Sequence, residues 1–173
     1  MHVPNQSLYA AYQALRAAGK SHGLKLFGAR AVDSMRLEKG FLHWKTDILT
    51  EFDPFETALD RFVKMDKGDF IGRDALLKRR ANGPTKKLVT LKIDATHAPA
   101  HGGASLTHGH RIVGTITSGN WGHRVGMNLA HAFVTPELAA EGTEMHLDMC
   151  GDLVTTIVIA PSPYDPEYTR MRS

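Results

Sequence analysis

Two charged side chains, Arg36 and Glu38, lie just before an aromatic run in a stretch that could hold an anion. The arginine suits a carboxylate because its planar guanidinium can donate two parallel hydrogen bonds. Residues two apart on a helix do not share a face, so one can face a site while the other faces packing or solvent. From spacing alone, a surface ion pair between Arg36 and Asp33, three residues earlier, is the favoured alternative.

An aromatic side chain, Trp44, follows the same helix directly after His43. Its indole offers a flat apolar face that could stack on a ring-shaped ligand. Residue type alone favours a different interpretation, in which Trp44 is a core residue at a domain junction. His43 could titrate near neutral pH, but no sequence neighbour marks it as a base. These residues predict an anion-plus-ring site at Arg36 and Trp44, and they do not indicate a reaction.

Other chemistries have weaker support. His97 and His101 are four apart, but Pro99 between them argues against a helical metal-binding pair. His108 and His110 could point the same way from a strand, yet no cysteine or carboxylate cluster completes a ligand set. The sequence contains neither G-x-G-x-x-G nor G-x-x-x-x-G-K-[ST]. We therefore predict no metal site and assign no catalytic residue.

Composition limits the class of protein. The chain has 173 residues, of which 42% are apolar and 23% charged, as in an ordinary globular protein. Its net charge of +3 is too weak to indicate nucleic-acid binding by itself. Cys150 is the only cysteine, which fits a reducing compartment. Residues 1–6 lack the pattern of a signal peptide and no apolar run reaches membrane-spanning length, so we expect a cytoplasmic location.

Helical periodicity dominates the first half of the chain. Val32 and Met35 are predicted on the inner face of the second helix. Asp53-Pro54 should start a short helical turn, because proline suits the first helical position. The predicted helices cover residues 7–18, 29–39 and 73–81, with a possible strand at 61–65.

The pattern changes to strands after Pro84. Six short strands separated by turn signals predict a small antiparallel barrel or sandwich. We therefore expect two domains, residues 1–84 and residues 85–173, in an α+β protein. The predicted strands cover residues 87–93, 104–107, 111–117, 129–134, 144–149 and 153–159.

Several separated motifs occur in the order typical of one family. Residues 28–38 resemble the motif G-x-R-A-x-D-x-x-R-x-E, and residues 55–59 occupy the place of the motif T-P-x-E-A-G-L. Further along the chain, residues 69–76 resemble D-F-I-G-R-E-A-L, and residues 114–119 match G-x-x-T-S-G. In these motifs the chain resembles the glycine cleavage T-protein (aminomethyltransferase) family. The resemblance extends over nearly the whole chain.

Three details resemble one branch of that family more closely, the folate module of dimethylglycine and sarcosine dehydrogenases. His43-Trp44 replaces a region where simple T-proteins tend to carry tyrosine and glycine. Residues 122–126 are similar to the G-H-x-x-G of that branch, and residues 162–166 to its tail. A folate-dependent tRNA-modifying relative would show K-G-C-Y-x-G-Q-E, from which this chain departs after Phe41.

The resemblance implies a truncated α/β folate-binding segment followed by a six-stranded antiparallel β-barrel. It also implies tetrahydrofolate as the ligand, with Arg36 at the folate site and Trp44 at an aromatic position near it. The catalytic aspartate of the family and the glutamate that reads the pterin would lie upstream of this chain. We therefore expect a fragment whose partner is the missing amino-terminal part of its parent, with FAD only in an absent upstream domain.

The function expected from the resemblance is transfer of an aminomethyl or methylene unit from an N-methylglycine-derived donor to tetrahydrofolate. The parent would be an aminomethyltransferase or a dimethylglycine or sarcosine dehydrogenase-like enzyme. These 173 residues alone should bind folate weakly or not at all and should show no turnover. The alternative is a non-catalytic interaction or scaffold domain of the same fold that binds no folate. We expect neither nucleic acid nor membrane as a partner.

Overall fold

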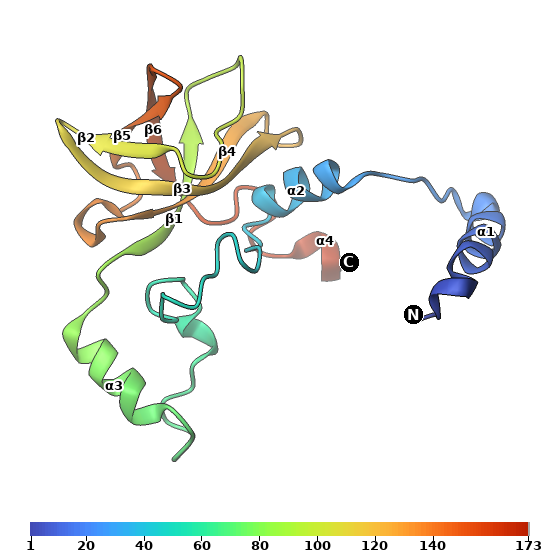
Figure 1. The fold of residues 1–173 in the computed structure, drawn as a ribbon, viewed down its shortest axis with the longest axis horizontal. Coiled ribbons are helices and arrows are strands. Elements are labelled where there is room, and N and C mark those ends of the chain that lie inside the picture. Colours follow the sequence, from blue (N-terminus) through green and yellow to red (C-terminus); the bar gives the residue numbers. More distant parts are fainter. Residues whose placement is uncertain (173) are drawn as a thin grey trace. The chain divides into compact units, whose positions relative to one another are not determined.

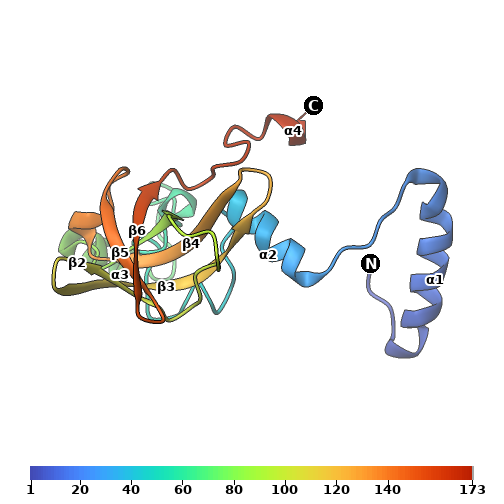
Figure 2. The same ribbon diagram turned by 90° about the horizontal axis from the view of Figure 1, so that it is seen from above.

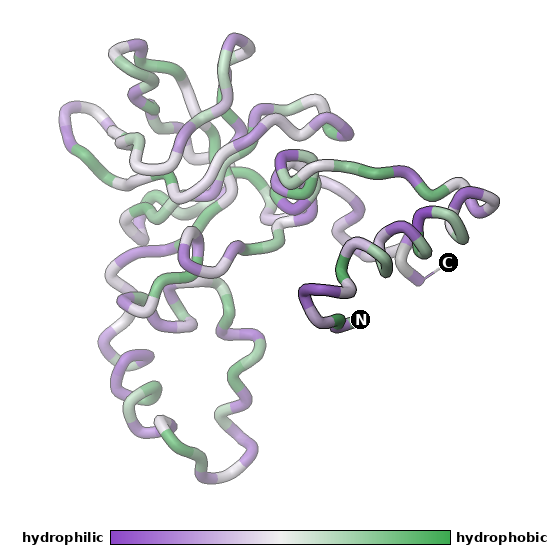
Figure 3. Tube along the Cα trace, turned by 45° about the vertical axis from the view of Figure 1, so that its right-hand side comes forward, coloured by the Kyte–Doolittle hydropathy of each residue, from purple (hydrophilic) through white to green (hydrophobic). Residues whose placement is uncertain are grey.

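The computed structural model describes residues 1–172, and its contacts divide the chain after Val32 into two compact units. The first unit contains helix α1 (Leu8–Gly19), flanked by 3-10 turns at Asn5–Ser7 and Lys20–His22. Hydrophilic and hydrophobic residues alternate along this helix in Figure 3. Its apolar positions Leu8, Tyr12 and Leu15 are 38% to 59% exposed. The predicted helix is therefore present.

Helix α2 (Ala29–Glu38) agrees with the predicted second helix, but its buried face does not. The sequence pattern placed Val32 and Met35 inside, whereas they are 46% and 48% exposed. The buried face consists of Ser34, Leu37 and Glu38, which follow helical spacing. That prediction was wrong because two of the three buried side chains are polar and find hydrogen-bond partners that a hydropathy pattern cannot show.

The connection between α2 and the barrel is largely irregular. Asp53 starts the predicted helical turn and accepts hydrogen bonds from the backbone N–H groups of Phe55 (2.8 Å) and Glu56 (3.1 Å), while Glu56 accepts the N–H of Asp53. The strand proposed at residues 61–65 is wrong, because the chain forms a 3-10 turn at Asp60–Phe62 there. Helix α3 (Arg73–Asn82) then follows and ends at Gly83.

The barrel agrees closely with the predicted strands. It consists of β1 (Lys87–Ile93), β2 (Ser105–His108), β3 (Arg111–Gly122), β4 (Met127–Val134), β5 (Glu144–Met149) and β6 (Asp152–Ile159). These antiparallel strands close into a barrel in the order β1-β4-β3-β2-β5-β6. Figures 1 and 2 show the barrel from two directions. The expected six-stranded antiparallel barrel is confirmed.

Strand β4 is buried on both of its faces, which matters for the site. Ala130, Ala132 and Val134 alternate along it and belong to the barrel core. The intervening residues His131 and Phe133 point away from that core, yet they are 1% and 4% exposed. The irregular connection supplies their cover: the Phe52 ring stacks on Phe133 with 4.0 Å between the ring centroids. The barrel therefore carries a second, outer layer of packing over β4.

The short carboxy-terminal helix α4 (Thr169–Arg172) follows the barrel. Within residues 1–172, every helix is too short or too polar to pass through a bilayer.

Candidate functional site

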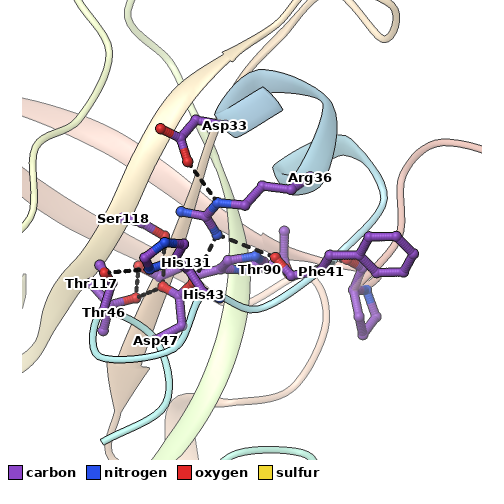
Figure 4. A network of polar contacts seen from close by, with 11 residues as sticks. Asp33, Arg36, Phe41, His43, Thr46, Asp47, Thr90, Thr117, Ser118 and His131 are labelled. Atoms are coloured by element: carbon purple, nitrogen blue, oxygen red, sulfur yellow. Dashed lines mark hydrogen bonds and ion pairs between the residues drawn. The ribbon is translucent and has the colours of Figure 1, made fainter. Parts of the chain in front are cut away.

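A buried carboxylate, Asp47, organises the polar contacts between α2, the following loop and the barrel (Figure 4). Its Oδ1 accepts hydrogen bonds from the hydroxyls of Thr117 (2.5 Å) and Ser118 (2.6 Å). Its Oδ2 accepts from Arg36 Nη1 and from the backbone N–H of His43, each at 2.8 Å. Four donors on two oxygens satisfy the charge, which is the condition for burying a carboxylate.

A β-bulge explains how neighbouring hydroxyls reach the same oxygen. Successive side chains on a regular strand point to opposite faces. The pairing of β3 with β4 shifts register between Ile116 and Ser118, so Thr117 is the extra residue. The bulge therefore turns both Thr117 and Ser118 toward Asp47. Gly119 follows because a Cβ there would lie 2.4 Å from the carbonyl oxygen of Ala100.

Arg36 is fixed by two acids from different elements. Its Nε lies 3.0 Å from Asp33 Oδ1, so the i−3 ion pair favoured from spacing is present. Its Nη1 also donates to the carbonyl oxygen of Phe41 at 3.2 Å, beside the Asp47 contact. The side chain is only 12% exposed. These contacts use Nε and Nη1 (Figure 4). Within residues 1–172 no hydrogen bond of the structure uses Nη2, so this nitrogen can donate to another group.

An open cleft of about 490 Å³ lies beside this network. Its wall joins α2, the loop after it, the segment before β2 and the bulged part of β3. The residues that line it include Asp33, Arg36, His43, His101, Thr117 and Asn120. The cleft thus presents hydrogen-bonding groups of both kinds, with one arginine held in place, and suits a polar or anionic group of a small ligand.

Two titratable groups of the network, Asp47 and His131, have shifted pKa values. Burial alone would raise the pKa of Asp47, but hydrogen bonds from Ser118, Thr117 and the His43 backbone lower it below its usual value. Burial lowers the pKa of His131 to about 4, against the charge of Asp47, which raises it. At neutral pH the site therefore contains ionised Asp47 beside neutral His131.

Glu38, on the other side of α2, binds the β3–β4 hairpin of the barrel. Glu38 is 2% exposed, and its carboxylate accepts hydrogen bonds from the backbone N–H groups of Arg124 (2.5 Å) and Val125 (3.2 Å) in the β3–β4 hairpin. Ser34 donates to the carbonyl oxygen of Trp121 at 2.5 Å in the same region. The spacing argument that Arg36 and Glu38 face different surroundings is confirmed: one faces the cleft, and the other anchors the helix to the barrel.

The two residues predicted to bind folate lie in different surroundings. Arg36 lines the cleft, whereas Trp44 is 57% exposed and is not among the residues lining it. Trp44 is also not the core residue of the alternative interpretation. Its backbone pairs with Ile48 in a tight loop that includes Lys45 at a φ of +70°. The assignment of Arg36 and Trp44 to a folate site stays a prediction.

Sequence reasoning missed Asp47 and His131. Nothing in the local sequence marks Asp47 as buried, since it follows Lys45 and Thr46 in a polar loop. In the sequence, the adjacent hydroxyls of Thr117 and Ser118 are recognisable only as part of a family motif. Buried hydroxyls need a hydrogen-bond partner, but the sequence does not show that Thr117 and Ser118 are buried, so it contains no signal that points to Asp47.

Comparison with known proteins adds an independent line of information. Residues 1–67 match the GCVT N-terminal domain, and residues 86–165 match the glycine cleavage T-protein C-terminal barrel domain. A solved structure, the glycine cleavage system aminomethyltransferase T from Bartonella henselae, superposes with a TM-score of 0.82 at 28% identity. The superposition covers 95% of this chain and 45% of that protein.

Curated relatives belong to two kinds of protein. The chain is 32% identical to mitochondrial dimethylglycine dehydrogenase of Homo sapiens, over 94% of this chain and 19% of that enzyme. It is 30% identical to mitochondrial sarcosine dehydrogenase of Mus musculus, over 99% of this chain and 20% of that enzyme. It is 39% identical to an aminomethyltransferase of Saccharopolyspora erythraea, over 87% of this chain and 41% of that protein. The chain thus spans about a fifth of the dehydrogenases and less than half of the aminomethyltransferase.

Proposed function

Because the chain belongs to the glycine cleavage T-protein family, we propose that it forms the carboxy-terminal part of a tetrahydrofolate-dependent one-carbon transfer module. The parent would be a dimethylglycine or sarcosine dehydrogenase-like protein or an aminomethyltransferase, the kinds of protein among its relatives. In that parent, an aminomethyl or methylene unit would pass from an N-methylglycine-derived donor to tetrahydrofolate. FAD would belong to an upstream domain, and the cytoplasmic location is part of the same proposal.

One observation carries this proposal. Arg36 comes from the family's helix motif and Thr117-Ser118 from its T-S-G motif, and Asp47 binds both. The two motifs, about 80 residues apart in sequence, therefore build one wall of a cleft. Such a wall supports a ligand site because the buried Asp47 carboxylate holds Arg36, Thr117 and Ser118 on it in place.

The chain would contribute positioning rather than bond chemistry. Tetrahydrofolate carries carbonyl and carboxylate oxygens, and the Nη2 donor of Arg36 suits either. Trp44 would pack against a ring of the ligand from the exposed loop. Holding the folate amine against the one-carbon unit lowers the activation barrier by roughly several kcal/mol in general. The carboxylate that binds the pterin and the catalytic acid would come from the amino-terminal part of the parent.

The alternative proposal is a scaffold domain of the same fold that binds no folate. Anaerobic calorimetric titration of tetrahydrofolate into the full-length parent separates the two. A folate module should bind saturably, and Arg36→Ala should weaken binding roughly 10- to 100-fold through loss of a charged hydrogen bond. Trp44→Ala should weaken it by about 2- to 10-fold.

Two controls separate binding from folding. Arg111→Ala and Ile112→Ala, at the exposed start of β3, should leave the affinity unchanged. The melting temperature of each variant shows whether the fold survives. The scaffold proposal would be favoured if the parent did not bind tetrahydrofolate saturably. It would also be favoured if folded variants at Arg36 and Trp44 bound tetrahydrofolate with the same affinity as the parent. The isolated 173 residues should bind tetrahydrofolate weakly or not at all. Methylene transfer by these residues alone would contradict the proposal that the amino-terminal part of the parent supplies the catalytic acid and the pterin-binding carboxylate.

A further inference from the structure

Asp33 contributes a carboxylate to the wall of the cleft beside Arg36. Its side chain is 48% exposed, whereas that of Asp47 has no exposed surface. Its Oδ1 accepts from Arg36 Nε at 3.0 Å, and within residues 1–172 no hydrogen bond of the structure uses its Oδ2. Asp33 therefore holds the arginine with one oxygen and can accept a hydrogen bond from a ligand with the other.

A donor lies beside this acceptor. The planar guanidinium directs one N–H of Nη2 parallel to the N–H of Nε, so Nη2 lies on the edge of Arg36 that faces Asp33 (Figure 4). In the described part of the chain, the enclosed side-chain atoms without a hydrogen-bond partner belong to Asn128, His131 and Thr135. The unpaired Nη2 is not one of them, so it has surface exposed to solvent. Arg36 and Asp33 thus present a donor and an acceptor next to each other.

The positive charge of Arg36 is already compensated. Its Nη1 pairs with Asp47 and its Nε with Asp33, so two carboxylates surround one guanidinium. Among the lining residues that the structure describes, Arg36 is the only lysine or arginine. A carboxylate at Nη2 would lie beside the second oxygen of Asp33, where like charges repel each other. The cleft therefore disfavours an anionic group next to Arg36, although the arginine by itself suits one.

We propose that Asp33 makes this cleft selective for an uncharged amide edge, that of a primary carboxamide or a ring lactam, over a carboxylate. The amide carbonyl accepts from Arg36 Nη2, and the adjacent amide N–H donates to Asp33 Oδ2. In these amides the acceptor and the donor lie on one edge, as their partners do in the cleft. For the proposed function, on which this last step rests, an uncharged part of tetrahydrofolate rather than one of its carboxylates meets Arg36.

Three isosteric probes test the proposal. Benzamide, benzoate and acetophenone share a ring and a carbonyl and differ in the NH2, O⁻ or CH3 beside it. With the full ¹⁵N-labelled chain near neutral pH, benzamide should bind roughly tenfold tighter than acetophenone, which lacks the donor. Benzoate should also bind roughly tenfold more weakly than benzamide, because it lacks the donor and is repelled by Asp33. Chemical shifts of the Gly102 and Asn120 amides, which line the cleft, measure the affinities and locate the binding.

Asp33→Asn should reverse the preference between benzamide and benzoate. The single oxygen of the asparagine would stay with Arg36 Nε, so its NH2 group would face the ligand as a second donor. Benzoate should then bind severalfold tighter than benzamide, whereas Asp66→Asn, at an exposed acid, should keep the original order. Asp33 is half-exposed and Arg36 keeps its contact with Asp47, so the variant should fold.

The comparison of the three probes on the unmodified chain stands by itself if Asp33→Asn does not fold. Equal affinity for benzamide and acetophenone, tightest binding of benzoate, or no shift of the cleft amides with any probe would overturn the proposal. An order of affinities that survives in folded Asp33→Asn would also overturn it. The probes contain no pterin, so the result does not depend on whether the parent binds tetrahydrofolate.

Discussion

The guanidinium of Arg36 and the carboxylate of Asp47 form an ion pair in which Nη1 lies 2.8 Å from Oδ2. The pair joins helix α2 to the loop that covers the barrel, and the same carboxylate binds the bulged part of β3. Asp47 has no exposed surface, and Arg36 is 12% exposed. A buried pair of this kind is costly to break, since one partner alone leaves an uncompensated charge.

We expect Asp47→Ala to lower the free energy of unfolding by about 3–5 kcal/mol, because Arg36 and two hydroxyls would lose their acceptor. Asp47→Asn keeps the shape and should cost less, roughly 2–3 kcal/mol. Urea unfolding followed by circular dichroism measures both values. Asp66→Asn, at an exposed acid, should stay within about 0.5 kcal/mol of the parent chain. Equal stability of Asp47→Ala and the Asp66 control would show that the network does not hold the loop.

The stability of the chain should depend on pH through His131. Its pKa is lowered to about 4 in the folded chain from 6.5, chiefly by burial. The unfolded chain therefore binds the proton more readily, so this contribution is present above pH 6.5 and is lost as the pH falls toward 4. The loss should reach roughly 3 kcal/mol.

Unfolding curves across that pH range test this dependence. His131→Gln should flatten the curve, whereas His110→Gln, at an exposed histidine, should leave it unchanged. The lowered pKa of Asp47 acts below its ordinary value of 3.8, outside this window, and that of Glu56 acts only below about 4.5, at its lower end. A slope that survives in His131→Gln would assign the dependence to other groups.

Removal of the Glu38 carboxylate should loosen the β3–β4 hairpin. Glu38→Ala leaves the N–H groups of Arg124 and Val125 without their acceptor and should cost about 2–3 kcal/mol. Glu38→Gln keeps an acceptor and should cost about 1 kcal/mol. Hydrogen exchange should show faster exchange of these two amides in Glu38→Ala than in Glu38→Gln. Identical exchange in both variants would mean that the contact does not protect the hairpin.

Ala58→Gly should stabilise the chain by about 0.5–1 kcal/mol. Ala58 occupies the left-handed region at a φ of +57°, which costs a residue with a Cβ about 1–2 kcal/mol. Part of that gain is offset by the greater freedom of glycine in the unfolded chain. Ala75→Gly in α3 is the matched control and should destabilise by about 1 kcal/mol. Thermal melting of the two variants should therefore shift in opposite directions.

The sequence by itself determined the barrel and the helices of this chain. Alternating apolar residues and turn signals located all six strands, five of them to within two residues at each end, because each strand must bury one face and each turn needs its own residues. The third strand, predicted over residues 111–117, continues to Gly122. The helix at 29–38 was also predictable, although its buried face was not. Hydropathy could not show that Ser34 and Glu38 would be buried, since their partners lie some 85 residues away.

Only the tertiary structure decided the site. Asp47 and His131 are ordinary loop and strand residues until the bulge in β3 and the outer layer over β4 enclose them. Burial then fixes which of the two is charged, because the enclosed aspartate receives four hydrogen bonds, whereas desolvation of the enclosed histidine lowers its pKa and keeps it neutral. The charge states of Asp47 and His131 therefore depend on contacts between segments far apart in the chain, which the local sequence does not indicate.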